Sequence, residues 1–248
     1  MTASAPEAPL LRIDAVTKNF GGFVALDNIN VEIRKGERFG LIGPNGSGKT
    51  TLVNCISGAL RPNKGAVLFA GVDITQLAAN QRSHRGIARS FQIPRPFRSM
   101  TVLENLMVAL DFATHRHLFE TEGHRRDAAM SILTRIGLAS KAFVSTATLT
   151  QVELRKMELA RAMATGPKLL ISDEAMAGLS TSEVDEVLDL LMSLGGEDIA
   201  IIMIEHIMQA VMRFSERVMC LDAGKIIAIG APSEVMANPR VQEAYLGT

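Results

Sequence analysis

The chain has few of the features that would assign it to a specialised class. Its 26 basic and 26 acidic residues give a formal net charge of zero, so no basic surplus indicates a nucleic-acid partner. It has only two cysteines, Cys55 and Cys220, which lie far apart within apolar runs. We therefore expect reduced core side chains in the cytosol, and neither a disulfide nor a metal site.

Long apolar runs are also missing. The longest candidate, residues 199–204, is followed by Glu205 and His206 and is much shorter than the about 18 residues of a membrane-spanning helix. Residues 1–6 lack the basic and apolar stretches of a signal peptide. Any connection with a membrane is therefore expected to go through a partner protein.

What the chain does have is a glycine-rich octapeptide that fits the phosphate-loop pattern G-x-x-x-x-G-K-[ST] at every fixed position. Glycine permits positive φ and close backbone approach, so successive N–H groups can face phosphate oxygens. Lys49 would supply a charge for the β- and γ-phosphates, and the Thr50 hydroxyl would bind Mg²⁺. The octapeptide consists of Gly43, Pro44, Asn45, Gly46, Ser47, Gly48, Lys49 and Thr50.

The surroundings of the octapeptide favour a nucleotide-binding loop. Residues 38–42 have the pattern of a short apolar strand entering the loop, and residues 51–56 have the pattern of a helix leaving it. The alternative, a glycine-rich turn before a helix, is disfavoured because the motif requires this strand–loop–helix context.

The rest of the chain alternates apolar strands with helices, which predicts an α/β fold with a parallel sheet wrapped by helices. Residues 93–163 interrupt this alternation as a helical insertion, with a capping box at Thr101 and Glu104. The expected strands are 10–16, 23–33, 37–42, 65–69, 169–172, 199–204, 218–221 and 225–229. The expected helices are 51–56, 152–164, 182–194 and 206–212.

Two carboxylates follow the apolar strand 169–172, at the strand end where ligands bind in such sheets. Asp173 suits the second shell of Mg²⁺, and Glu174 is placed to polarise an attacking water as general base. The alternative is an acidic pair that caps the following helix. The phosphate loop upstream favours the catalytic interpretation.

With both motifs present, the chain resembles the ATP-binding subunits of ABC transporters over nearly its full length. The resemblance implies a P-loop NTPase (RecA-like) core with an antiparallel β subdomain and an inserted helical subdomain. It implies a single domain over 1–248, in which 10–92 and 164–248 form the core and β subdomain and 93–163 the helical subdomain. ATP and Mg²⁺ are the implied cofactors.

The resemblance also gives roles to isolated residues. Phe20 falls where the family places an aromatic ring that stacks on adenine. Gln92 falls at the Q-loop, which touches Mg²⁺ and water, and His206 falls at the switch histidine, which contacts the γ-phosphate. The alternatives are a core phenylalanine, a loop glutamine and a surface histidine. The implied site comprises catalytic Lys49, Gln92, Glu174 and His206, nucleotide-binding Phe20, the octapeptide, Thr51 and Thr150, and metal-binding Thr50, Gln92 and Asp173.

The chain is most similar to the ATPases of branched-chain (hydrophobic) amino acid importers. The likeness rests on residues 90–105, 176–179 and 238–247. Urea and amide importers share this pattern, so the substrate stays open. The implied partners are a second ABC ATPase subunit, two transmembrane permease subunits and, through the permease, a periplasmic or extracellular substrate-binding protein, with no nucleic acid. The implied location is cytoplasmic, peripheral on the inner face of the cell membrane.

The chain departs from the family at the signature loop, which usually reads L-S-G-G-Q and here reads Leu149-Thr150-Gln151-Val152-Glu153. Thr150 keeps a hydroxyl that can reach a γ-phosphate. Val152 resists positive φ, and the Glu153 carboxylate would repel a polyanion unless it turns away or pairs with a neighbour such as Arg155. In this family each ATP lies between one subunit's phosphate loop and the other's signature. We therefore hypothesise a heterodimer with a partner whose signature is intact.

Two alternatives remain beside the importer ATPase. A nucleotide-binding but poorly hydrolysing regulatory subunit is favoured by the altered signature and opposed by the intact Glu174 and His206. A soluble ABC ATPase outside transport usually carries two cassettes, coiled-coil arms or basic extensions, and this sequence has none of them. Within the importer interpretation, residues 92–100, with Phe97, are the candidate for passing motion to a membrane subunit.

Overall fold

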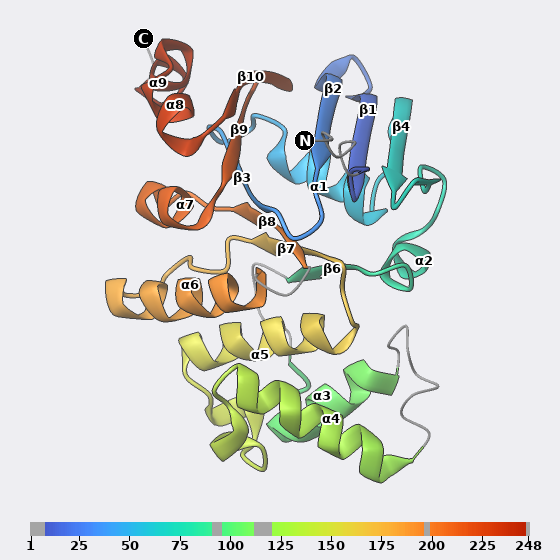
Figure 1. Ribbon diagram of the computed structural model, residues 1–248, viewed down its shortest axis with the longest axis vertical. Helices are drawn as coiled ribbons and strands as arrows, with labels where there is room; N and C mark the ends of the chain where they lie inside the picture. The colour runs from blue at the N-terminus through green and yellow to red at the C-terminus, as the bar shows by residue number, and fades with distance from the viewer. Residues whose placement is uncertain (1–7, 91–95, 112–120, 196–198, 247–248) are drawn as a thin grey trace, which may run out of the picture. The chain divides into compact units, whose positions relative to one another are not determined.

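The computed structural model describes residues 8–90, 96–111, 121–195 and 199–246 (Figure 1). By its internal contacts the chain forms two compact parts. The first part comprises residues 1–82 and 195–248, and the second part comprises residues 83–194.

The first part contains an antiparallel sheet in the order β2-β1-β4-β5. One face of β2 is buried, because Val31 and Ile33 are covered while Asn30 and Glu32 face solvent. This alternation is typical of an antiparallel sheet with one wet face. The strands are β1 (Leu11–Phe20), β2 (Phe23–Ile33), β4 (Lys64–Phe69) and β5 (Val72–Asp73).

The first part also contains parallel strands, in which β3 pairs with both β8 and β9. Every residue of β8 is buried, which explains its unbroken apolar sequence. The strands expected at 218–221 and 225–229 are confirmed as β9 and β10, which pair antiparallel. These strands are β3 (Arg38–Ile42), β8 (Ala200–Ile204), β9 (Arg217–Asp222) and β10 (Lys225–Gly230). The helices of this part are α1 (Lys49–Ser57), α2 (Ala79–Ser83), α7 (Met208–Phe214), α8 (Pro232–Ala237) and α9 (Pro239–Leu246).

A small apolar cluster joins the C-terminal helices to the end of β3. Ile42, Cys220, Val235 and Val241 are all buried in it. Ile42 is the last residue before the phosphate loop, so α8 and α9 share an apolar cluster with the end of the strand that leads into the loop. Cys55 and Cys220 are both buried, which confirms their expected place in the core.

The second part is mostly helical. Its strands β6 (Ile87–Ser90) and β7 (Leu169–Asp173) pair in parallel. The capping box at Thr101 is confirmed, because the Thr101 N–H donates to the Glu104 carboxylate at 2.7 Å and the Glu104 N–H donates to the Thr101 hydroxyl at 3.2 Å. The helices are α3 (Val102–Asp111), α4 (Glu122–Arg135), α5 (Gln151–Ala164) and α6 (Thr181–Gly195), with short turns η2 (Ala139–Lys141) and η3 (Thr146–Thr148).

Two expected boundaries were wrong. The first strand extends to Phe20 and does not stop at residue 16, because an irregularity at Ala15, whose φ is 49°, keeps the strand paired with β2 beyond that point. The helix expected at 206–212 begins at Met208, because Ile207 has an extended backbone (φ −83°, ψ 95°). Among the described residues, no helix is both long and apolar enough to cross a bilayer.

Candidate functional site

The backbone of the phosphate loop fits glycine alone at two positions. Gly43 has a φ of 146°, and a Cβ there would lie 2.1 Å from the Leu221 carbonyl oxygen and 2.7 Å from the Ser47 hydroxyl. Gly48 has a φ of 108°, and a Cβ there would lie 2.7 Å from the Ala25 carbonyl oxygen. The loop is therefore tightly held between β9 and β2, in a conformation that other residues resist.

The polar groups of the loop suit an anion. Gly48 is the N-cap of α1 and has no side chain to cap it, so the first N–H groups of the helix stay available at its positive end. Lys49 is buried and donates from Nζ to the carbonyls of Gly43 at 2.7 Å and Pro44 at 3.0 Å. The buried Ser47 hydroxyl has no hydrogen-bond partner within the described part of the chain. Thr50, exposed beside it, offers an oxygen that suits Mg²⁺.

His206 lies at the same sheet edge as the loop. β3 and β8 are parallel neighbours, and Leu41 pairs with Ile204. Gly43 and His206 each follow that pair by two positions, so the exposed His206 leaves the sheet beside the start of the loop.

Phe20 lies at the tip of the β1–β2 hairpin, where it pairs with Phe23. Its ring is 48% exposed, and the Lys18 ammonium lies 5.3 Å from the ring centroid. The alternative of a core phenylalanine is therefore wrong, and the ring is available to a flat partner.

The carboxylates at the end of β7 belong to the second part. The Arg89 guanidinium on β6 lies 2.5 Å from the Asp173 carboxylate, and both side chains are mostly buried. Glu174 has a φ of 49°, an unusual backbone for a residue that is not glycine, and such conformations cluster at functional sites. Gln92, the third residue expected nearby, lies outside the described residues.

The carboxylates do not cap the next helix. α6 begins at Thr181, and Ser180 donates from its N–H at 2.8 Å and from its hydroxyl at 2.7 Å to the Glu183 carboxylate. These bonds lower the pKa of Glu183. Because α6 has its own cap, the helix-capping alternative for Asp173 and Glu174 is wrong.

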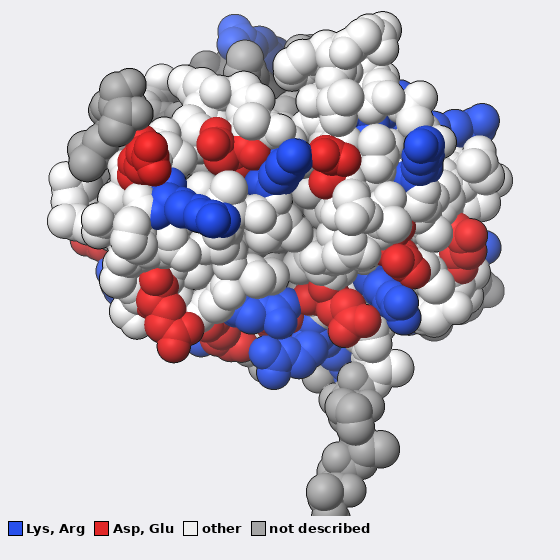
Figure 2. Space-filling view, turned by 90° about the horizontal axis from the view of Figure 1, so that it is seen from above, with Lys and Arg blue, Asp and Glu red and all other residues white. Residues whose placement is uncertain are grey.

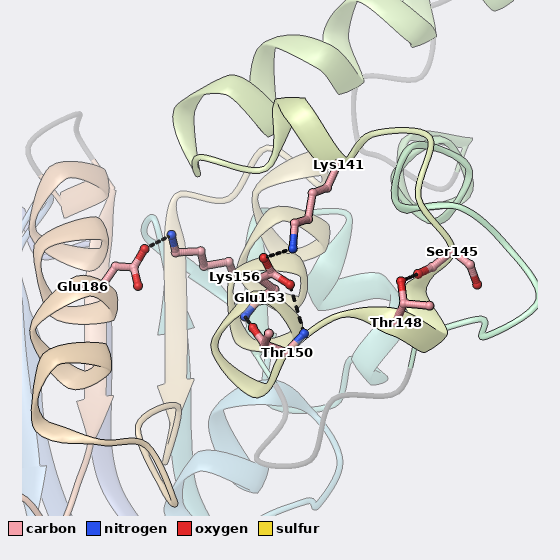
Figure 3. Close-up of polar contacts among 7 residues, drawn as sticks. All are labelled: Lys141, Ser145, Thr148, Thr150, Glu153, Lys156 and Glu186. Atoms are coloured by element: carbon pink, nitrogen blue, oxygen red, sulfur yellow. Dashed lines mark hydrogen bonds and ion pairs between the residues drawn. The ribbon is translucent and has the colours of Figure 1, made fainter.

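The altered signature forms the start of α5 (Figure 3). Thr150 is the N-cap, and its hydroxyl accepts from the Glu153 N–H at 3.4 Å while the Glu153 carboxylate accepts from the Thr150 N–H at 2.9 Å. The other oxygen of Glu153 pairs with Lys141. Burial alone would raise the pKa of Glu153, but the bonds from Lys141 and Thr150 lower it. The negative charge therefore has a local partner.

The structure settles two details of the signature that the sequence left open. The partner of Glu153 is Lys141, since Arg155 instead donates to the Ala177 carbonyl at 3.2 Å. Val152 lies inside α5, and its φ is not positive. The Thr150 hydroxyl, which accepts one bond, keeps its proton to donate.

Two family models match the sequence and show the family of the chain. A family model described as ABC transporter matches residues 26–177, and one described as branched-chain amino acid ATP-binding cassette transporter matches residues 225–248. The chain belongs to the ABC transporter ATP-binding family. The ABC cassette is an ATPase, since ATP hydrolysis coupled to transport is the activity of this family.

Individual relatives agree with this assignment. The cassette is 38% identical over 250 residues to the high-affinity branched-chain amino acid transport ATP-binding protein LivG of Escherichia coli K12, covering 96% of this chain and 98% of that one. It is 35% identical to BraF of Pseudomonas aeruginosa, with the same coverage. A solved ATP-binding cassette of an ABC transporter in its ADP conformation matches with a TM-score of 0.88 and 32% identity, covering 97% and 100% of the two chains.

Three residues at the site of the ABC cassette were missed from the sequence. Arg89 pairs with Asp173, Lys141 pairs with Glu153, and Tyr245 accepts a hydrogen bond from the loop. Arg89 and Lys141 lie outside the sequence motifs, although Arg89 is a charged residue in an otherwise uncharged strand. Tyr245 lies within residues 238–247, which support the subfamily likeness, but that likeness gave it no role at the phosphate loop.

The charged side chains on one face of the molecule form no patch of a single sign. Figure 2 shows acidic and basic side chains interspersed over one face, among described residues, without a continuous field of either sign.

Proposed function

We propose that this cassette is the ATP-binding and hydrolysing subunit of an importer for branched-chain or other hydrophobic amino acids, or related amides. The match of residues 225–248 to the branched-chain amino acid family carries the proposal, because it lies outside the motifs that all ABC ATPases share. The names of the LivG and BraF relatives support the same substrate class.

The proposed nucleotide site assigns each residue a task. The loop from Gly43 to Thr51 holds the phosphates, with Lys49 on the β- and γ-phosphates and Phe20 on adenine. His206 contacts the γ-phosphate from the neighbouring strand end. The fit of the loop, with its uncapped helix start and unpartnered Ser47 hydroxyl, supports this assignment.

The proposed hydrolytic groups follow β7. Glu174 takes a proton from the attacking water, while Thr50 and Asp173, with Gln92, provide oxygens for Mg²⁺. When bound, Mg²⁺ neutralises charge on the phosphates. Arg89 fixes the Asp173 carboxylate in one orientation through its ion pair.

We also propose that a second ABC subunit supplies the signature that closes on this chain's nucleotide. Val152 remains the main departure from the family, because the charge of Glu153 is paired with Lys141. Light scattering of the Glu174→Gln protein with and without Mg·ATP tests this arrangement. A monomer that binds ATP without pairing supports the heterodimer, whereas an ATP-dependent homodimer would reject it.

The proposed partners in the membrane are two permease subunits, which would keep the cassette peripheral on the inner face. Phe97 is the proposed contact. Its ring is 44% exposed and lies 5.4 Å from the Arg161 guanidinium. Its backbone is fixed, since Asn105 bonds both its N–H at 2.8 Å and its carbonyl at 3.1 Å. An exposed ring on a rigid backbone suits docking of a short helix.

Uptake by the assembled transporter tests the substrate. Proteoliposomes that contain the cassette, its partner subunit and the permeases, with the binding protein outside, are given labelled leucine, urea or acetamide. We expect ATP-dependent uptake of leucine that is lost with Glu174→Gln in the cassette. Uptake of urea or acetamide without leucine would reject the amino acid assignment.

A further inference from the structure

Tyr245 is the chain's only tyrosine and makes a contact that the proposed mechanism does not use. The N–H of Gly43, the first residue of the phosphate loop, donates to the Tyr245 hydroxyl oxygen at 2.7 Å. The two residues are 202 positions apart, so the bond joins the C-terminal helix α9 to the loop.

The contact is supported by the packing of α9. Val241 is buried in the cluster that contains Ile42, the residue immediately before Gly43. Tyr245 lies one helical turn beyond Val241 and therefore on the same face of α9. The helix thus shares an apolar cluster with Ile42 and accepts a hydrogen bond from the next residue, Gly43.

Gly43 is held from both sides. Its N–H is bonded to Tyr245 and its carbonyl is bonded to the Lys49 ammonium at 2.7 Å. An ammonium that turns toward a phosphate gives up its bond to this carbonyl. The Tyr245 hydroxyl then remains as the polar anchor of Gly43, whose buried N–H needs an acceptor.

We propose that Tyr245 is a positioning residue for nucleotide binding: its hydroxyl holds the entrance of the phosphate loop in the shape that receives ATP. The inference rests on the proposed role of residues 43–50 as the nucleotide site. The C-terminal helix α9 would then contribute to ATP binding, in addition to belonging to the segment that matches the branched-chain amino acid family.

The chemistry of the phenol suits this task. Tyr245 is 38% exposed as a whole residue, and partial burial of the phenol raises its pKa to about 12. The hydroxyl therefore stays neutral near pH 7 and accepts from Gly43 without adding a negative charge beside the phosphates. The hydroxyl also keeps its own proton.

The test is Tyr245→Phe, which removes the hydroxyl and keeps the ring. The matched control is Glu243→Gln, an exposed change on the same helix. The affinity for Mg·ATP is measured on folded protein, and KM and kcat are measured in the assembled transporter. Loss of one hydrogen bond predicts that Kd and KM rise about three- to tenfold while kcat changes less than about twofold.

The outcomes separate this inference from the proposed function. Values of Kd and KM for Tyr245→Phe that equal those of Glu243→Gln would overturn the role of Tyr245, whatever happens to unfolding temperature. Lys49→Ala serves as the reference for the loop itself. If Lys49→Ala binds Mg·ATP as the wild type does, the proposed nucleotide site is wrong. If Lys49→Ala loses Mg·ATP but Tyr245→Phe binds it as the wild type does, only the positioning role is wrong.

Discussion

Replacing Arg82 should destabilise α1, the helix that follows the phosphate loop. Its side chain is 0% exposed, and it donates from Nη1 to the carbonyls of Cys55 at 2.6 Å and Ile56 at 2.9 Å. These carbonyls belong to the last turn of α1. Arg82 also donates to the carbonyls of Thr75 at 2.9 Å and Leu77 at 3.0 Å. A buried cation thus satisfies the negative end of α1.

Replacing Arg82 by Met removes every one of these donors. Each buried acceptor left without a donor costs about 1–3 kcal/mol. Water that enters the vacated space recovers part of this loss, and the desolvation cost of the guanidinium, which lowers the pKa of Arg82, is also removed. We therefore expect the free energy of unfolding to fall by about 3–5 kcal/mol, and the melting temperature by roughly 10 °C.

The assay is urea denaturation of the nucleotide-free protein, followed by circular dichroism. Arg85→Met is the control, because Arg85 is exposed and should change the free energy of unfolding by less than about 0.5 kcal/mol. A loss for Arg82→Met below about 1 kcal/mol would refute the argument that this guanidinium supports the end of α1.

Three further predictions concern the second part. Because the pKa of Glu153 is lowered, its ion pair with Lys141 stabilises the fold above the carboxyl's ordinary pKa of about 4.3, and this stabilisation is lost as the pH falls. Lys141→Met should therefore reduce the fall in the free energy of unfolding between about pH 5 and 3. The same dependence of that free energy on pH in both proteins, measured by denaturation at stepped pH, would contradict this. The triple change Thr150→Ser, Val152→Gly and Glu153→Gln should speed hydrolysis by the assembled transporter about threefold or more, and an unchanged ATPase rate would count against the heterodimer. Phe97→Ala should uncouple uptake from hydrolysis with ATP affinity intact, whereas lost ATP affinity would reject the docking assignment.

Most of the features that the sequence predicts correctly are encoded by residues close together in the chain. The strand 23–33, the capping box at Thr101 and the helix after Lys49 all depend on residues within a few positions of one another, and all are present. The phosphate loop is likewise one continuous segment. Such features can be predicted because turn, cap and periodicity are encoded where they form.

The contacts that were missed join distant segments. Arg82 reaches the end of α1, and Tyr245 reaches Gly43 across 202 positions. Lys141 pairs with the Glu153 carboxylate, for which the sequence suggested a neighbour such as Arg155, and Arg155 donates to the Ala177 carbonyl. A single sequence does not specify which of several polar side chains will face a buried group once the chain has packed.

In the proposed mechanism, Glu174 is the general base of an ATPase whose phosphates are held by residues 43–50. The most direct measurement compares ATP hydrolysis and Mg·ATP binding for wild-type and Glu174→Gln cassettes in the assembled transporter. We expect Glu174→Gln to leave the Kd unchanged and to slow hydrolysis about a hundredfold or more. Hydrolysis by Glu174→Gln at the wild-type rate would contradict it.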